Sequence, residues 1–292
     1  MNNKYFIGLL WLFFITSINA APITFNTALP ISQGEWIWRL QYVQIQSKDS
    51  SQLQRNRQEE LIASTFVYGV SPKLALFATL GYSDRTFSAF SSAPRQAKGL
   101  IDSKLLARYT LYQKDFLAGS FRIAPFVGVK LATARDDLQD QNGRLPKPVQ
   151  LGSGSQDWTG GIVTTYATSS WGIDAQISYL DAGQSNQFSK GDRFSADFAF
   201  QYPLFKPSNK NGEADFFDLQ LEFNYRDQAQ STTAGLSDIN SGGVTLLVAP
   251  GLQYITRNLI IESSVQLPIQ QDLNGQALEM DSIFRLGFRT NF

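Results

Sequence analysis

The chain contains no cysteine and no histidine, and these absences exclude several kinds of function. Without cysteine there is no disulfide and no lipid-modified cysteine behind an export signal. Without histidine, the chain lacks the general base that Ser–His phospholipases and Asp–His proteases use, so both kinds of enzyme are excluded. Histidine and cysteine are also the commonest zinc ligands, and both are missing. A Ser–Lys or carboxylate-only catalyst stays compatible with the composition, but no motif points to one. We therefore expect no enzyme, no metal site and no cofactor.

Long apolar runs are missing after residue 20, so the sequence predicts no membrane-spanning helix. Residues 1–20 read as a cleaved signal peptide: Lys4 supplies the positive charge, residues 5–15 are apolar and Ala20 is a small residue at the cleavage position. This apolar core is shorter than the roughly 20 residues that a spanning helix needs. The alternative is a short N-terminal anchor. We expect a signal peptide at 1–20 and one domain at 21–292.

Charge of one sign is not in excess, because 25 basic residues balance 25 acidic ones. A nucleic-acid partner, which would require a basic face, is therefore not expected. Aromatic residues, in contrast, make up 13% of the chain. An exported chain that is rich in aromatics and poor in helical patterns is typical of a β protein.

The last stretch, residues 280–292, alternates between apolar side chains and a second face that carries Arg285 and Arg289, and it ends on Phe292. Such alternation is typical of a β-strand with two different faces. A strand in a soluble sandwich would show the same alternation, but bacterial outer-membrane barrels commonly end on an aromatic residue. We expect this strand to close a barrel against residues 35–46, with Arg285 and Arg289 near carboxylates such as Glu262.

About twelve strands with the same period-two pattern are predicted along the chain. Most are longer than the 5–6 residues usual in soluble sheets and match the roughly 9–11 residues that cross a bilayer. Short and long connections alternate, as in barrels with periplasmic turns and extracellular loops. Tyr and Trp sort to both strand ends, as membrane-interface belts do. The expected strands are 35–46, 60–70, 73–85, 99–112, 120–132, 158–168, 171–181, 192–203, 216–228, 242–255, 258–268 and 280–292.

If the apolar faces point to lipid, the charged residues of the strands must face the lumen, because Arg or Lys facing lipid costs about 2–4 kcal/mol at the midplane. These charges either brace the interior or line a solute path. Their mixed signs argue against strong ion selectivity. Pro125 and Pro250 fall inside strands, where we expect a bulge or a bend. The predicted lumen-lining residues are Arg39, Asp102, Lys104, Arg108, Arg122, Lys130, Asp174, Asp197, Asp218, Glu222, Arg226, Glu262, Arg285 and Arg289.

Several segments of the chain resemble one family of exported barrels. They are 124–130, 152–155 with Trp158, 191–194, 241–243, 249–254, 265–268, 271–275 and the terminal strand. The family is the meta-pathway phenol-degradation type of outer-membrane transporter. The resemblance implies an outer-membrane barrel that passes small, often hydrophobic compounds, and it supplies no catalytic residue.

The sequence thus predicts an all-β, antiparallel up-and-down barrel of about twelve strands in the bacterial outer membrane. The expected function is passage of small solutes, including hydrophobic or aromatic ones, through a narrow, charge-lined lumen. The alternative is a structural or surface-interaction barrel whose lumen is plugged. The expected partners are outer-membrane lipid, an unidentified small solute and the barrel-assembly machinery, which would recognise the C-terminal strand ending in Phe292.

Overall fold

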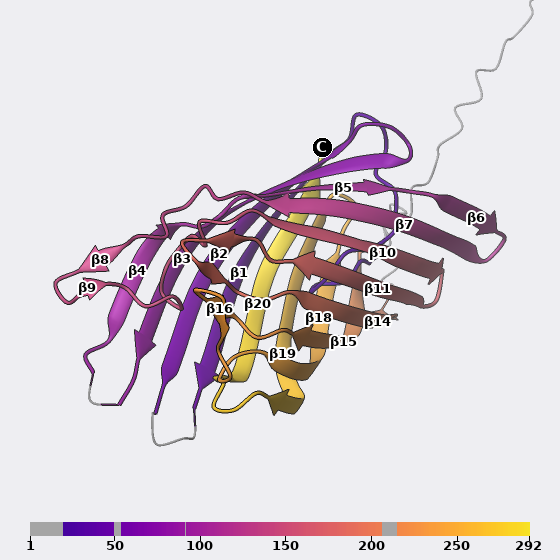
Figure 1. Ribbon diagram of the computed structural model, residues 1–292. Coiled ribbons are helices and arrows are strands. Elements are labelled where there is room, and N and C mark those ends of the chain that lie inside the picture. Colours follow the sequence, from indigo (N-terminus) through magenta and orange to yellow (C-terminus); the bar gives the residue numbers. More distant parts are fainter. Residues whose placement is uncertain (1–19, 50–53, 91, 206–214) are drawn as a thin grey trace, which may run out of the picture.

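The computed structural model describes residues 20–49, 54–90, 92–205 and 215–292. They form a closed antiparallel barrel of 12 wall strands (Figure 1). Closure comes from β20 (Glu279–Asn291), which pairs with β1 (Trp36–Lys48) over nearly its whole length. The fold class and the closing role of the last strand are therefore confirmed. The predicted signal peptide lies outside the described residues apart from Ala20.

Most wall strands match the predicted ranges and several are longer, because period-two patterning fixes a strand's presence better than its ends. No helix among the described residues has the length and hydropathy required to cross a bilayer. The remaining uninterrupted wall strands are β2 (Asn56–Gly69), β3 (Leu74–Ser88), β7 (Gly119–Lys130), β10 (Asp157–Thr168), β11 (Gly172–Asp181), β14 (Arg193–Phe205), β15 (Phe216–Gln228), β18 (Gly243–Ile255) and β19 (Leu259–Leu273).

The fourth wall strand, predicted as one piece at 99–112, is broken into β4 (Arg95–Leu100), β5 (Lys104–Tyr109) and β6 (Tyr112–Phe116). Only β5 pairs on both sides; β4 pairs with β3, and β6 with β7. The break between β5 and β6 lies opposite Pro125, whose nitrogen cannot donate to the ladder. The irregularity expected at Pro125 is thus on the partner strand, since β7 itself pairs with β10 without a shift.

Pro250 affects its strand in a similar one-sided way. The ladder from β18 to β15 passes through Pro250 without a shift, whereas the ladder from β18 to β19 lacks pairs at Ala249 and Pro250. The register is the same on both sides of this gap, so of the predicted bulge or bend the bulge is absent at Pro250, and the ladder loses two pairs. A register shift does occur nearby, between Leu246 and Leu247.

The two ends of the barrel differ. At the turn end, tight turns join β2 to β3, β10 to β11 and β18 to β19, and the start of β1 meets Phe292 through two backbone hydrogen bonds of 3.0 Å. At the loop end, long connections carry short strands of their own. These are the hairpin β8 (Gln139–Asp140) and β9 (Gly143–Arg144), and a sheet of β12 (Gln184–Ser185), β13 (Phe188–Ser189), β16 (Thr232–Thr233) and β17 (Leu236–Ser237).

The outer wall is apolar and the inner wall polar, as the alternation predicts. On β15, Leu221 is 38% exposed while the adjacent Glu222 is 0% exposed. Aromatic pairs stack at the turn end, with ring centroids 4.6 Å apart for Trp36 and Tyr68 and 5.0 Å apart for Phe217 and Tyr254. At the loop end, Phe194 and Tyr225 lie 6.4 Å apart. This surface agrees with the predicted outer-membrane location.

Candidate functional site

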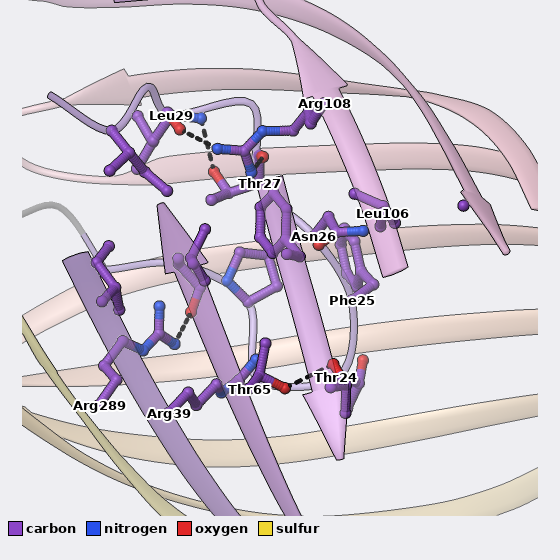
Figure 2. A pocket seen from close by; sticks show the side chains of 18 of the residues that line it. Thr24, Phe25, Asn26, Thr27, Leu29, Arg39, Thr65, Leu106, Arg108 and Arg289 are labelled. Carbon is purple, nitrogen blue, oxygen red and sulfur yellow. Dashed lines mark hydrogen bonds between the residues drawn. The ribbon is translucent and has the colours of Figure 1, made fainter. Parts of the chain in front are cut away.

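Residues 21–34, which precede β1, fold into the barrel from the turn end and return to it. We call this segment the arch. Figure 2 shows part of it, Thr24 to Leu29, among side chains of the wall. Pro22 and Pro30 lack a backbone N–H, which disfavours a further β-strand here. The backbone groups of the arch therefore depend on inward-facing side chains for hydrogen bonds.

Glu222 on β15 is the main acceptor for the arch. Its carboxylate accepts the backbone N–H of Ile23 at 2.6 Å and that of Thr24 at 3.0 Å, and it also accepts the Thr24 hydroxyl. Asn224, two residues further along the strand, donates to Thr24 Oγ1 at 2.9 Å. A buried carboxylate is stable only when its oxygens are satisfied, so Glu222 and the arch stabilise each other.

Three arginines hold the carbonyls of the arch. Arg108 donates to the carbonyl oxygens of Thr27 and Leu29, the latter at 2.6 Å (Figure 2). Arg39 donates to the carbonyl of Ile23 at 2.8 Å, and Arg289 to that of Ala21 at 3.2 Å. A charged donor makes these bonds stronger than neutral ones.

Close packing fixes the arch at three points. Ile23 is 1% exposed and packs over Gly251, where an added Cβ would lie 2.7 Å from Ile23 Cδ1. Ala28 lies in a buried cluster with Ala124, Phe126 and Val163. At its end, the arch passes so close to Gly69 that a Cβ there would lie 2.0 Å from the carbonyl oxygen of Ser32.

Beneath the arch, Glu262 on β19 forms ion pairs with two arginines. Its oxygens lie 2.5 Å from Arg39 on β1 and 2.7 Å from Arg289 on β20. The predicted contact between Arg289 and Glu262 is therefore present. Arg285 differs from the expectation, because it donates to the amide oxygen of Gln266 at 3.1 Å instead of meeting a carboxylate.

One cavity of about 1760 Å³ remains inside the barrel beside the arch. Its lining includes Ser169 and Asn258 at the turn end, and Lys190 and Gln228 at the loop end. Arch residues such as Phe25 and Asn26 form part of its wall. The cavity thus reaches both ends of the barrel, and the arch narrows it on one side.

The charge along this cavity is strongly unbalanced. The carboxylates that line it are Glu35, Asp102, Asp115 and Asp157. The basic residues that line it are Arg39, Arg85, Lys104, Arg108, Arg122, Lys130, Lys190, Arg193, Arg285 and Arg289. The mixed signs expected from the sequence are present, but basic residues dominate the cavity, because five of the six predicted inward carboxylates do not line it.

The fourteen predicted lumen residues divide into two groups. Eight line the cavity: Arg39, Asp102, Lys104, Arg108, Arg122, Lys130, Arg285 and Arg289. The other six face inward away from its lining: Asp174, Asp197, Asp218, Glu222, Arg226 and Glu262. Of these, Asp174 accepts from Thr165 and Gln201, Asp197 from Gln176 and Asn224, and Asp218 from Gln220.

Two of the cavity carboxylates organise the loop end. Asp102 accepts the backbone N–H groups of Ala134 and Ser153 at 3.0 and 2.9 Å, and thereby anchors both ends of the longest loop. Asp157 pairs with Lys130 at 2.6 Å. Leu145, Val149 and Leu151 of that loop form a small apolar core with Ala97 of β4. The loop therefore completes the wall where β4 has no second strand partner.

Several site residues were missed by the sequence reasoning. Glu59 on β2 lies 2.8 Å from Arg85 on β3 and also pairs with Arg57, and Lys190 and Arg193 line the cavity. They lie at strand ends or in loops, where the period-two pattern no longer assigns a face. The arch itself carried no periodic signal.

Lys190, in the loop before β14, has a perturbed pKa. Although part of its side chain is exposed to the cavity, loss of hydration together with the nearby charges of Arg193, Arg57 and Arg85 lowers the pKa of Lys190 to about 8, against the attraction of Glu59. Among the described residues, no group of three or more acidic side chains is placed to bind a metal ion.

Comparison with known proteins supports the fold. The chain is similar to the crystal structure of the COG4313 outer membrane channel from Pseudomonas putida F1, with a TM-score of 0.68 and 12% identity over 94% of this chain and 100% of that one. It is also similar to the β domain of the Bordetella autotransporter BrkA, with a TM-score of 0.51 and 9% identity over 89% of this chain and 100% of that one. No family model and no curated protein matches the sequence.

The fold is therefore that of bacterial outer-membrane barrels, channels among them. The finer resemblance to the meta-pathway phenol-degradation family is not confirmed by these comparisons. At such low identity, similarity of structure identifies the fold alone, and function has to be argued from the site.

Proposed function

We propose that this chain is an outer-membrane channel that lets small solutes pass along the cavity beside the arch. The observation that carries the proposal is that one cavity has lining residues at both ends of the barrel, from Ser169 and Asn258 to Lys190 and Gln228. A barrel with a purely structural role would gain nothing from such a space. The similarity to a solved outer-membrane channel agrees with this function.

The arch sets the size of what passes. It crosses the lumen from β15 and β18, which bind Ile23 and Ala21, to β5 and β10, which bind Thr27 and Ala28, and its residues form part of the cavity wall. The lining combines basic side chains, which favour anionic solutes, with apolar ones such as Phe25, Phe77 and Leu106, which suit the hydrophobic compounds implied by the family resemblance. Passage of aromatic compounds remains a prediction. An aromatic ring that carries a negatively charged group would suit both the basic and the apolar parts of the lining.

Planar-bilayer recording of the purified, refolded barrel tests the proposal. We expect small, well-defined single-channel steps, and uptake of small solutes when the barrel is placed in liposomes. A barrel that gives neither conductance nor solute uptake would overturn the channel function and favour the plugged alternative, in which the arch blocks the lumen and the outer loops act.

Two partner assignments accompany the proposal. The exposed apolar wall would contact outer-membrane lipid. The terminal strand β20, with Phe292 71% exposed at its end, would be recognised by the barrel-assembly machinery. Replacement of Phe292 by Asp would then reduce the amount of folded barrel in the membrane while leaving refolding in detergent unchanged.

A further inference from the structure

Three basic side chains at the loop end of the cavity have no anionic partner. They are Lys104 on β5, Arg193 on β14 and Lys190 in the preceding loop, and all three line the cavity. Among the described residues, no carboxylate lies within 4.0 Å of any of their nitrogens, although other lining cations such as Lys130 and Arg289 are paired. None of the three is therefore used in an ion pair with a described residue.

The strand register places Lys104 and Arg193 near one level of the wall, and Lys190 precedes Arg193 by three residues in the chain. Lys104 pairs with Lys130, and Lys130 pairs with Asp157 on the next strand. Two residues after Asp157 on β10, Thr159 pairs with Leu180 on β11. Leu180 in turn pairs with Arg193 on β14. Lys104 and Arg193 are thus on the same tier of the wall, separated by three strands that curve around the cavity.

The carboxylates of this tier do not neutralise the three cations. Asp157 lies 2.6 Å from Lys130, and Asp102 accepts two backbone N–H groups of the long loop as well as lying 3.7 Å from Lys130. Arg193 also keeps a buried Nε without any hydrogen-bond partner. A buried donor without a hydrogen-bond partner lowers the stability of the folded state. A bound anion would supply the missing acceptor.

We propose that Lys104, Lys190 and Arg193 form a binding site for small anionic solutes, such as carboxylates, at the loop end of the cavity. The inference rests on the proposed channel function, for which it names the class of solute. An anion entering from the loop side would gain charge-assisted hydrogen bonds from a guanidinium and two ammonium groups. A neutral solute of the same shape would gain none of these.

Binding can be measured without conduction, so failure of this site and failure of the channel are distinguishable. The probes are 4-fluorobenzoate and its neutral isostere 4-fluorobenzamide, observed by fluorine NMR with the full barrel in detergent micelles. We expect saturable binding of fluorobenzoate that weakens with added salt. Fluorobenzamide should bind at least roughly tenfold more weakly, because it cannot form the charge-assisted hydrogen bonds.

The variant Lys190→Gln/Arg193→Gln removes two of the three cations without touching an ion pair or the arch. We expect it to bind fluorobenzoate roughly tenfold more weakly. The control Lys73→Gln/Lys114→Gln makes the same change of net charge at two exposed lysines outside the main cavity, and should bind as the unmodified barrel does. Equal binding of both probes, or unchanged binding by the first variant, would overturn the site. Heat-shifted gel mobility confirms that each variant folds.

Conductance then separates the two proposals. Anion binding without conductance would overturn the channel and leave the site. Conductance without preference for fluorobenzoate would leave the channel and overturn the site.

Discussion

Glu222 accepts the backbone N–H of Ile23 at 2.6 Å across 199 residues of sequence, and this contact holds the arch inside the barrel. The carboxylate lies on the inner face of β15, is 0% exposed and also binds Thr24. Glu222 is thus the main acceptor among the groups that set how much of the lumen is filled, beside the donors Arg39 and Arg108.

Replacing Glu222 with Leu should therefore release the arch. The substitution leaves two backbone N–H groups and one hydroxyl without an acceptor, so the arch would no longer gain from its place in the lumen. We expect larger single-channel conductance in planar bilayers. The control Glu60→Leu removes an exposed carboxylate of β2 and should leave conductance unchanged.

Release of the arch can also be followed chemically, because the chain contains no cysteine. A single Asn26→Cys substitution places a thiol on the arch. A bulky maleimide should react with it roughly tenfold faster or more when Glu222→Leu is present, as expected from the loss of several hydrogen bonds. Equal reaction rates in both backgrounds would show that Glu222 does not hold the arch.

The sequence was sufficient for the wall of the barrel but not for its interior. Period-two patterning identified β15 and correctly placed Leu221 outside and Glu222 inside. It gave Glu222 and Glu262 the same role, although one binds the arch and the other pairs with Arg39 and Arg289. That difference depends on contacts far apart in sequence, for which a local pattern carries no information.

The charge of the cavity was missed for a related reason. Counting inward-facing residues treats every side chain as equally available to a solute. In the structure, Glu222 is used by the arch and Glu262 by two arginines, while Lys104 and Arg108 line the cavity. Net charge along a lumen depends on these pairings, and they follow only from the packed structure.

The facing of β15 makes a further prediction. Leu221 lies on the lipid side, so Leu221→Arg should destabilise the folded barrel by about 2–4 kcal/mol. Urea unfolding in lipid vesicles measures this change. Asp227→Arg, on the same outer face but at the exposed loop end of the strand, should be nearly neutral, and an equal loss of stability for both variants would contradict the assignment.

Glu262 should be required for stability. Glu262→Gln leaves Arg39 and Arg289 without a carboxylate beneath the arch, and removal of one partner from a buried ion pair costs about 3–5 kcal/mol. We expect the urea midpoint to fall accordingly. Glu279→Gln, at the exposed start of β20, is the matched control and should unfold as the unmodified barrel does. An unchanged midpoint for Glu262→Gln would mean that the pair contributes no net stability.

The ion preference of the channel should depend on pH through Lys190. Its pKa of about 8 means that Lys190 is charged below that pH and neutral above it. The charged groups that face it are Arg193, Arg57, Arg85 and Glu59. Preference for anions should therefore fall as the pH on the loop side rises from 7 to 9. The reversal potential in a KCl gradient measures this. The variant Lys190→Gln should show a lower anion preference already at pH 7 and little further change up to pH 9. If the variant kept the full change between pH 7 and 9, a group other than Lys190 would be titrating in that range.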